Sequence, residues 1–166
     1  MPEAHSTSTG KGFAIALRYL TGRAASSREI ARLLQRKGVD RSETAEVLRR
    51  LEEIGYIDDR RFATEWASVR CDRRGSATLG REGLRSGLIR RGIEPDLAAE
   101  VADNLMTEEQ EIRAAIELVA RRGASYAHLD AETRQRRLWS YLARRGFRAS
   151  VIAKALRLDD RDMVET

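Results

Sequence analysis

Two adjacent aspartates, Asp58 and Asp59, are of a residue type that could carry chemistry. Paired carboxylates can bind a metal ion or share a proton, provided that both point to one place. Neighbouring residues on a helix diverge by about 100°, so these two carboxylates do not converge. Asp58 instead suits the N-cap of a helix after Gly55, and Asp59 falls in the first turn, where negative charge is favourable. Helix capping is the favoured interpretation of both residues.

Other catalytic residue types are isolated in the sequence. His5 lies in a small, polar N-terminal stretch, and His128 has no partner cysteine or ordered second histidine. Cys71 is the only cysteine, which excludes an intrachain disulfide and a zinc cluster. No G-x-x-x-x-G-K-[ST] phosphate loop is present. We therefore expect a protein that is not an enzyme and that uses no cofactor and no metal.

The segment around the aspartates resembles the signature of a known family. The run Tyr56-Ile57-Asp58-Asp59-Arg60-Arg61-Phe62-Ala63 is similar to that of the RecX family, regulators of the RecA recombinase. Flanking pieces are also similar to the family: Ala16-Leu17-Arg18-Tyr19-Leu20, Arg23, Ser27, Arg70, Gly75, Leu84 and Arg91-Gly92-Ile93. The resemblance covers about residues 13 to 158. The chain departs from the family's usual pattern at Gly83 and Gly87.

This resemblance implies a regulator that binds RecA and RecA filaments on single-stranded DNA. It implies inhibition of strand exchange and ATP hydrolysis, and thereby modulation of DNA repair. Direct binding to DNA is left open. We interpret the signature residues as a structural junction between two helical units: Tyr56, Ile57, Asp58, Asp59, Arg61 and Phe62.

The composition favours small helical units over one large core. Of 166 residues, 34% are charged and only 5% are aromatic. The net charge is +5, and all basic residues except Lys11, Lys37 and Lys154 are arginines, which bind phosphate and carboxylate bidentately. Codon bias in a GC-rich genome is the alternative explanation of the arginines.

Charges interrupt the apolar runs, and no apolar signal core opens the chain. We therefore expect a cytoplasmic protein without a membrane segment. We also expect it to be a monomer.

A repeat of 54 residues runs through the chain. It separates Gly38, Gly92 and Gly146, and it also aligns Leu34 with Leu88 and Leu142, and Lys37 with Arg91 and Arg145. Such self-similarity is typical of repeat architectures. We therefore predict an all-α fold of three tandem three-helix repeat units in an elongated, curved array. The predicted segments are a disordered tail (1–11), three repeats (12–55, 56–106 and 107–158) and a frayed tail (159–166).

Capping patterns predict where several helices begin. Ser26 with Glu29 and Thr107 with Gln110 have the spacing of capping boxes; the other predicted starts are Asp40, Asp58, Pro95 and Asp130. Three glycines, Gly80, Gly83 and Gly87, lie along one predicted helix and each weakens it by ~1 kcal/mol relative to Ala. Their missing side chains permit close packing or bending.

Two segments carry more arginines than local acids can pair. Nine arginines between residues 60 and 91 face three acids, and eleven basic residues between 113 and 157 also face three. These arginines are thus explained at least as well by a surface that binds phosphate or an acidic protein face as by helix faces that are merely exposed to solvent. We predict that the contact residues form a stripe along the array: Arg73, Arg74, Arg90, Arg91, Arg144, Arg145 and Arg148.

An independent helical DNA-binding protein is the alternative function, because three-helix units are similar to helix-turn-helix folds. The third helices begin with Ser42-Glu43, Pro95-Asp96 and Arg148-Ala149-Ser150, and two of these would bring an acid to DNA. Contacts with phosphates that are unspecific for sequence remain compatible with the pattern. Trp66 is predicted in the core, whereas Trp139 is left open as a stacking residue.

Overall fold

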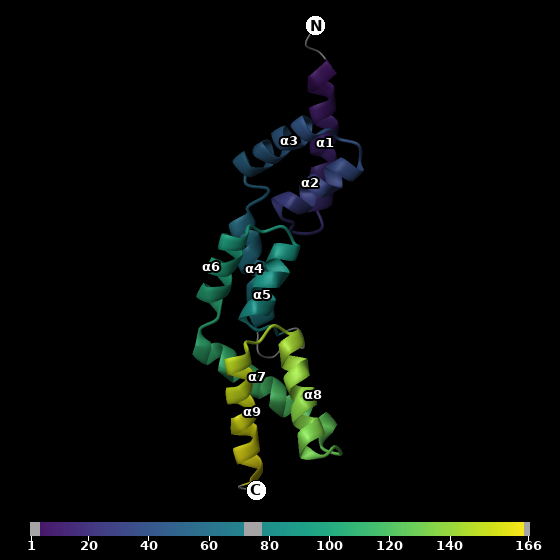
Figure 1. Cartoon of the computed structure of the whole chain (residues 1–166). Coiled ribbons are helices and arrows are strands. Elements are labelled where there is room, and N and C mark those ends of the chain that lie inside the picture. The colour runs from purple at the N-terminus through teal and green to yellow at the C-terminus, as the bar shows by residue number, and fades with distance from the viewer. Residues whose placement is uncertain (1–3, 72–77, 165–166) are drawn as a thin grey trace.

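The computed structural model describes residues 4–71 and 78–164, and all regular structure in these ranges is helical. The helices form an elongated, curved array in which the two ends of the chain lie at opposite ends (Figure 1). In chain order they are α1 (Ala4–Leu20), α2 (Ser27–Arg36), α3 (Arg41–Glu53), α4 (Asp59–Cys71), α5 (Arg81–Arg90), α6 (Pro95–Leu105), α7 (Glu108–Gly123), the short 3-10 helix η1 (Ala124–Tyr126), α8 (Ala131–Arg144) and α9 (Ala149–Val164).

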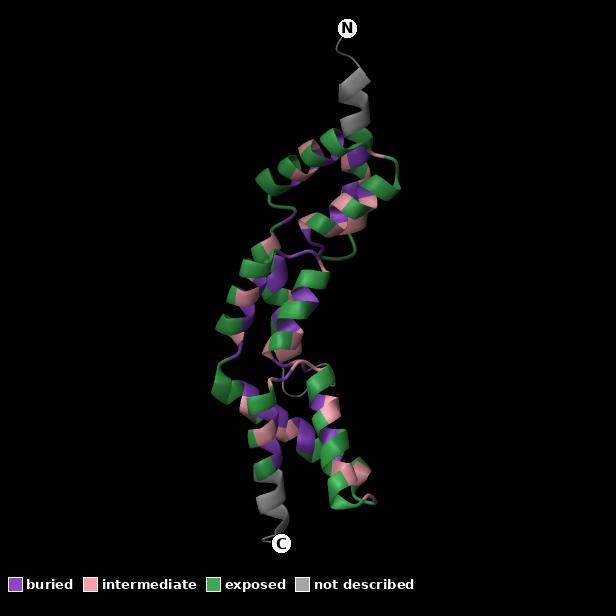
Figure 2. Ribbon diagram, viewed as in Figure 1, coloured by how far each residue is buried: buried purple, intermediate pink, exposed green. Residues whose placement is uncertain are grey.

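Each three-helix unit has its own core (Figure 2). The first is built by α1 to α3, the second by α4 to α6, and the third by α7 to α9. Leu34, Leu88 and Leu142, which the 54-residue repeat aligns, are all fully buried, one in each core. The predicted all-α array of three repeats is therefore confirmed. Trp66 packs partly buried against the second core, and Trp139 is 40% exposed.

All six predicted helix starts are confirmed, five of them by a side-chain cap; α6 begins at Pro95 as predicted but has no side-chain cap among the described residues. Ser26 and Glu29 form a capping box at α2, and Thr107 and Gln110 form one at α7. The remaining side-chain caps are those of Asp40 at α3 (2.8 Å to the amide of Glu43), Asp58 at α4 (2.9 Å to that of Arg61) and Asp130 at α8 (2.9 Å to that of Thr133). Each cap satisfies an amide that would have no partner within the helix.

Four glycines close helices in the left-handed region that side chains disfavour. Gly38, Gly92 and Gly146 have φ values of 79°, 92° and 74°, and Gly55 has 73°. A residue with a Cβ is strained at such φ values, so glycine is the residue that lets the chain leave the helix there. The repeat of Gly at 54-residue intervals is thus a repeat of helix ends.

The terminal helices extend further than predicted. Helix α1 begins at Ala4, within the stretch expected to be a disordered tail, and α9 continues to Val164, within the expected frayed tail. Neither helical extension contains a proline, the residue that stops a helix most strongly. Adding a turn to an existing helix is also easier than nucleating one, so polar composition alone is a weak stop signal.

Successive units are joined end to end through their middle helices, α2, α5 and α8. At the first joint, the Ser26 hydroxyl before α2 donates to the carbonyl of Arg91 at the end of α5 (2.5 Å). At the second, the amide of Gly80 before α5 donates to the carbonyl of Arg145 at the end of α8 (3.0 Å). The 54-residue repeat aligns the two donors, Ser26 and Gly80, and the two acceptors, Arg91 and Arg145. Both joints are therefore formed by equivalent surfaces of successive units.

The glycines of α5 explain how closely the second joint packs. A Cβ on Gly83 would lie 2.2 Å from the carbonyl oxygen of Arg145, and one on Gly80 would lie 2.5 Å from that of Gly146. The amide of Glu82 donates to the same Gly146 carbonyl (3.1 Å). Close packing, rather than bending, is therefore the role of Gly80 and Gly83. Gly87 serves a different contact, because its Cβ would collide with the ring of Trp66.

Candidate partner-binding surface

A carboxylate side chain connects the two units at each joint. At the first joint, an Asp59 oxygen accepts from the amide of Ser27 at the start of α2 (2.7 Å). At the second, Glu111 of α7 accepts from the amide of Arg81 at the start of α5 (3.0 Å). In both cases the first helix of one unit supplies an acceptor to a helix start of the preceding unit, where negative charge is favourable.

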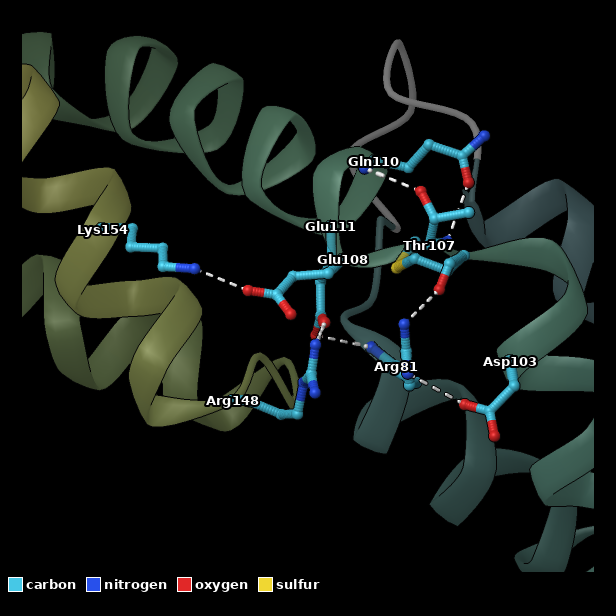
Figure 3. Close-up of polar contacts among 9 residues, drawn as sticks. Arg81, Asp103, Thr107, Glu108, Gln110, Glu111, Arg148 and Lys154 are labelled. Atoms are coloured by element: carbon cyan, nitrogen blue, oxygen red, sulfur yellow. Dashed lines mark hydrogen bonds and ion pairs between the residues drawn. The ribbon is translucent and has the colours of Figure 1, made fainter.

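The Glu111 carboxylate is fully buried and lies at the centre of a polar cluster (Figure 3). It accepts from Nε of Arg148 (3.1 Å), which also forms an ion pair with it. The Arg81 guanidinium donates to the carbonyl of Met106 (2.7 Å) and pairs with Asp103 (3.1 Å). These contacts compensate a charge that would be costly to bury alone.

The family signature builds the first joint. Asp58 caps α4, Asp59 reaches α2, and the Arg61 guanidinium donates to the carbonyl of Gly55 (3.1 Å). Ile57 is buried in the first core and Phe62 in the second. The side chain of Tyr56, by contrast, is 55% exposed. Except for Tyr56, the signature residues thus contribute to a junction between two units.

Three of the candidate contact arginines make contacts at the joints. Arg91 pairs with Glu29 (2.8 Å), and Arg145 donates to the carbonyl of Thr78 (2.8 Å) and lies over the ring of Tyr141. Arg148 pairs with Glu111. Arg91 and Arg145 thus bond to the preceding unit, and Arg148 bonds to the carboxylate that spans the second joint. The structure therefore does not place the three side chains on a fully free surface. Arg73 and Arg74 lie outside the described residues.

Arg90 and Arg144 are the two candidates that the structure leaves exposed. They end α5 and α8 and are aligned by the 54-residue repeat. The same repeat aligns them with Arg36, the exposed last residue of α2, which our sequence reasoning missed. Within the described chain, none of the three has a recorded hydrogen bond or ion pair. We call Arg36, Arg90 and Arg144 the arginine row, with one member on each unit.

Catalytic groups are sparse in the part of the chain that the structure describes. No group of three or more His, Cys, Asp or Glu residues among the described residues could hold a metal ion. Burial raises the pKa of the Cys71 thiol to about 11, which disfavours the reactive thiolate. No helix in residues 4–71 or 78–164 is long and apolar enough to cross a bilayer. The surface feature best suited to bind a partner is therefore the exposed positive charge of the protein.

The fold defines a helical-repeat protein, and solved structures share it. A crystal structure of RecX from Lactobacillus salivarius matches with a TM-score of 0.80 at 20% identity, covering 93% of this chain and 98% of that one. A crystal structure of a regulatory protein RecX matches with a TM-score of 0.82 at 19% identity, covering 93% of this chain and 75% of that one. At these identities the likeness concerns the fold.

Sequence comparison then identifies the family. Models of the first and third three-helix domains of RecX match residues 13–51 and 108–156. Regulatory protein RecX of Streptomyces coelicolor is 37% identical over 144 residues, 87% of this chain and 74% of that protein. That of Trichlorobacter lovleyi is 37% identical over 139 residues, 82% and 88%. The chain belongs to the RecX family of regulatory proteins, which confirms the resemblance drawn from the signature.

Proposed function

We propose that this protein binds RecA, alone and in filaments on single-stranded DNA, and inhibits strand exchange and ATP hydrolysis. The observation that carries the proposal is membership of the RecX family, with 37% identity to relatives named regulatory protein RecX. The array is elongated (Figure 1). This shape suits the task, because each unit can contact a successive protomer along a helical filament.

The arginine row is the contact surface that we propose on the array. Arg36, Arg90 and Arg144 are exposed and end the middle helix of their respective units. Arginine forks match both phosphate and carboxylate groups, so the row suits filament DNA or acidic faces of RecA. A contact repeated on each unit gains from multivalency, since the first contact raises the effective concentration of the others.

A pull-down tests the proposal directly. Immobilised protein is incubated with RecA, with and without single-stranded DNA, and strand exchange is assayed in parallel at matched salt. We expect RecA to be retained in both conditions and strand exchange to slow as the protein is added. Failure to retain RecA in either condition would contradict the proposal.

We further propose that the protein regulates without catalysing a reaction of its own. The expectation is that the purified chain hydrolyses neither ATP nor DNA in the absence of RecA. ATP turnover by the isolated protein, abolished by a point substitution within it, would overturn this part of the proposal.

The alternative is a helical protein that binds DNA independently of RecA. The arginine row, which has no partner among the described residues, favours it, since phosphate contacts need only positive charge. Against readout of base sequence, exposed acids cap or begin two third helices, Asp40 at α3 and Asp96 in α6. The pull-down without DNA distinguishes the two functions. RecA is retained there if RecA is the target, and it is not retained if the protein contacts only DNA.

A further inference from the structure

A basic groove lies on the first unit, and none of the candidate contact arginines considered so far lines it. It has a volume of about 570 Å³ and lies between α1 and the end of α2. Four exposed cations line it: Lys11, Arg18, Arg23 and Lys37. Among the described residues that line the groove there is no carboxylate. Its surface is therefore a concentration of one sign of charge within a concave site, which raises the local concentration of anions.

The four cations have no acidic partners in the described chain. Arg23 lies over the ring of Tyr19, 4.1 Å from its centroid, and no ion pair or hydrogen bond is recorded for the other three side chains. Elsewhere many exposed cations are paired, as Arg60 is with Glu100 and Lys154 with Glu108. Four like charges around one groove repel one another, so a bound anion would relieve an unfavourable arrangement.

In the described chain, the end of α2 differs from the ends of α5 and α8, because no other unit packs against it. The repeat aligns Lys37 with Arg91 and Arg145, which both bind the preceding unit. The adjacent glycines show the same difference. A Cβ on Gly92 or Gly146 would collide with the preceding unit, whereas one on Gly38 would meet nothing described within 4 Å. Among the described residues, the end of α2 is therefore not covered by another unit.

We propose that this groove binds the phosphodiester backbone of single-stranded DNA, without preference for base sequence. The inference rests on the proposed function, because it gives the regulator of a RecA filament its own contact with the filament's DNA. Lys11 and Arg18 lie seven residues apart on α1, a rise of about 10 Å, which suits an extended polyanion better than a single small anion. Arg18 on α1 and Lys37 at the end of α2 bind phosphate groups from the two sides of the groove.

The groove favours phosphates over an acidic protein segment. Protein interfaces depend on buried aromatic or aliphatic anchors in pockets. Here Ile15 and Leu33 already pack against the first core, and the Tyr19 ring is covered by the Arg23 guanidinium. Because the Tyr19 ring is covered by Arg23 on one face and also packs against the first core, it is poorly placed for base stacking, and recognition is confined to the backbone. Arg23 is held in place by this contact, so less side-chain freedom is lost on binding.

The test compares two variants that each lose two positive charges. R18Q/K37Q removes one cation from each side of the groove. The control, R49Q/R60Q, removes two exposed arginines elsewhere whose ion pairs contribute little to stability. Binding of fluorescein-labelled oligo(dT) is measured by anisotropy over a range of salt, without RecA, and helical content and thermal melting are recorded for both variants.

We expect R18Q/K37Q to bind oligo(dT) more weakly, with a plot of log affinity against log salt that is flatter by about 1.4 units, because single-stranded DNA contributes about 0.7 per lost contact. The control should keep the wild-type slope. Equal loss in both variants, or tighter binding of wild type to a poly-glutamate peptide than to oligo(dT), would overturn the inference. The RecA pull-down without DNA separates the two proposals: if it fails while the groove binds oligo(dT), only the proposed function is lost.

Discussion

At the residue scale, the Glu111 carboxylate of the third unit bonds to the start of α5 in the second unit. This carboxylate is fully buried and is compensated by Arg148 and by the amide of Arg81. We predict that Arg148→Ala lowers the free energy of unfolding by about 3 kcal/mol, because it leaves a buried charge without its ion-pair partner. Urea denaturation followed by circular dichroism measures the loss.

A surface arginine and a double variant serve as controls for this prediction. Arg144→Ala should change the free energy of unfolding by less than about 0.5 kcal/mol, because Arg144 is exposed and has no recorded partner in the described chain. Adding Glu111→Gln to Arg148→Ala should restore part of the lost stability, since it removes the uncompensated charge. Equal stability of the Arg148→Ala and Arg144→Ala proteins would show that the buried pair contributes nothing measurable.

Cys71 gives a second prediction at the residue scale. Burial raises the pKa of its thiol to about 11, so alkylation by iodoacetamide should be slow at pH 8 and accelerate until the pH approaches 11. In denaturant the thiol should titrate near 8.5. Because the folded pKa is the higher one, this thiol stabilises the fold below the unfolded pKa, and the contribution is lost as pH rises towards 11. Rapid alkylation of the folded protein at pH 8 would contradict the prediction.

At the scale of elements, glycines in two helices are predicted to have opposite effects when replaced by alanine. Gly83→Ala should destabilise the protein by about 1–3 kcal/mol, because its Cβ would meet the Arg145 carbonyl of α8 at 2.2 Å. Gly10→Ala in α1 should be stabilising by up to ~1 kcal/mol, because no described atom lies within 4 Å and alanine is the better helix former. Thermal melting of both variants decides the signs, and stabilisation by Gly83→Ala would mean that the joint does not constrain α5.

At the scale of the whole molecule, the arginine row should control inhibition of RecA. We predict that R90Q/R144Q weakens inhibition of strand exchange without lowering the melting temperature, and that adding Arg36→Gln weakens it further. Both parent arginines are exposed, so their loss removes contacts with a partner rather than contacts within the fold. Arg145 is unsuitable for this test, because it bonds to Thr78 at a joint and its loss would confound binding with stability.

The charge-matched control R49Q/R60Q applies here as well. It removes the same number of positive charges from exposed positions outside the row. If the control and R90Q/R144Q inhibit strand exchange equally at each salt concentration, general charge explains the inhibition and the arginine row is not the contact surface.

Much of the fold could be predicted from residues close together in the sequence. A cap such as Ser26 bonds to an amide three residues away, and Gly38 ends a helix by its own φ angle, so both signals are local. The 54-residue repeat then predicted the number of units, because equivalent residues such as Leu34 and Leu88 occupy equivalent buried positions. These features determined three helical units and most of their helix starts before any long-range contact was known.

The joints and the free surfaces were decided only by the tertiary structure. Asp59 looked like a residue of its own helix, yet its carboxylate accepts from Ser27 of the preceding unit. Arg145 and Arg144 are neighbours in sequence, but one bonds at a joint and the other is exposed. Charge and periodicity are properties of the sequence alone. Whether an arginine is free or bound depends on which helix end lies against it in the folded protein. Residues some 30 to 70 positions away supply those ends, so no local pattern could distinguish the basic residues that hold the array together from those left for a partner.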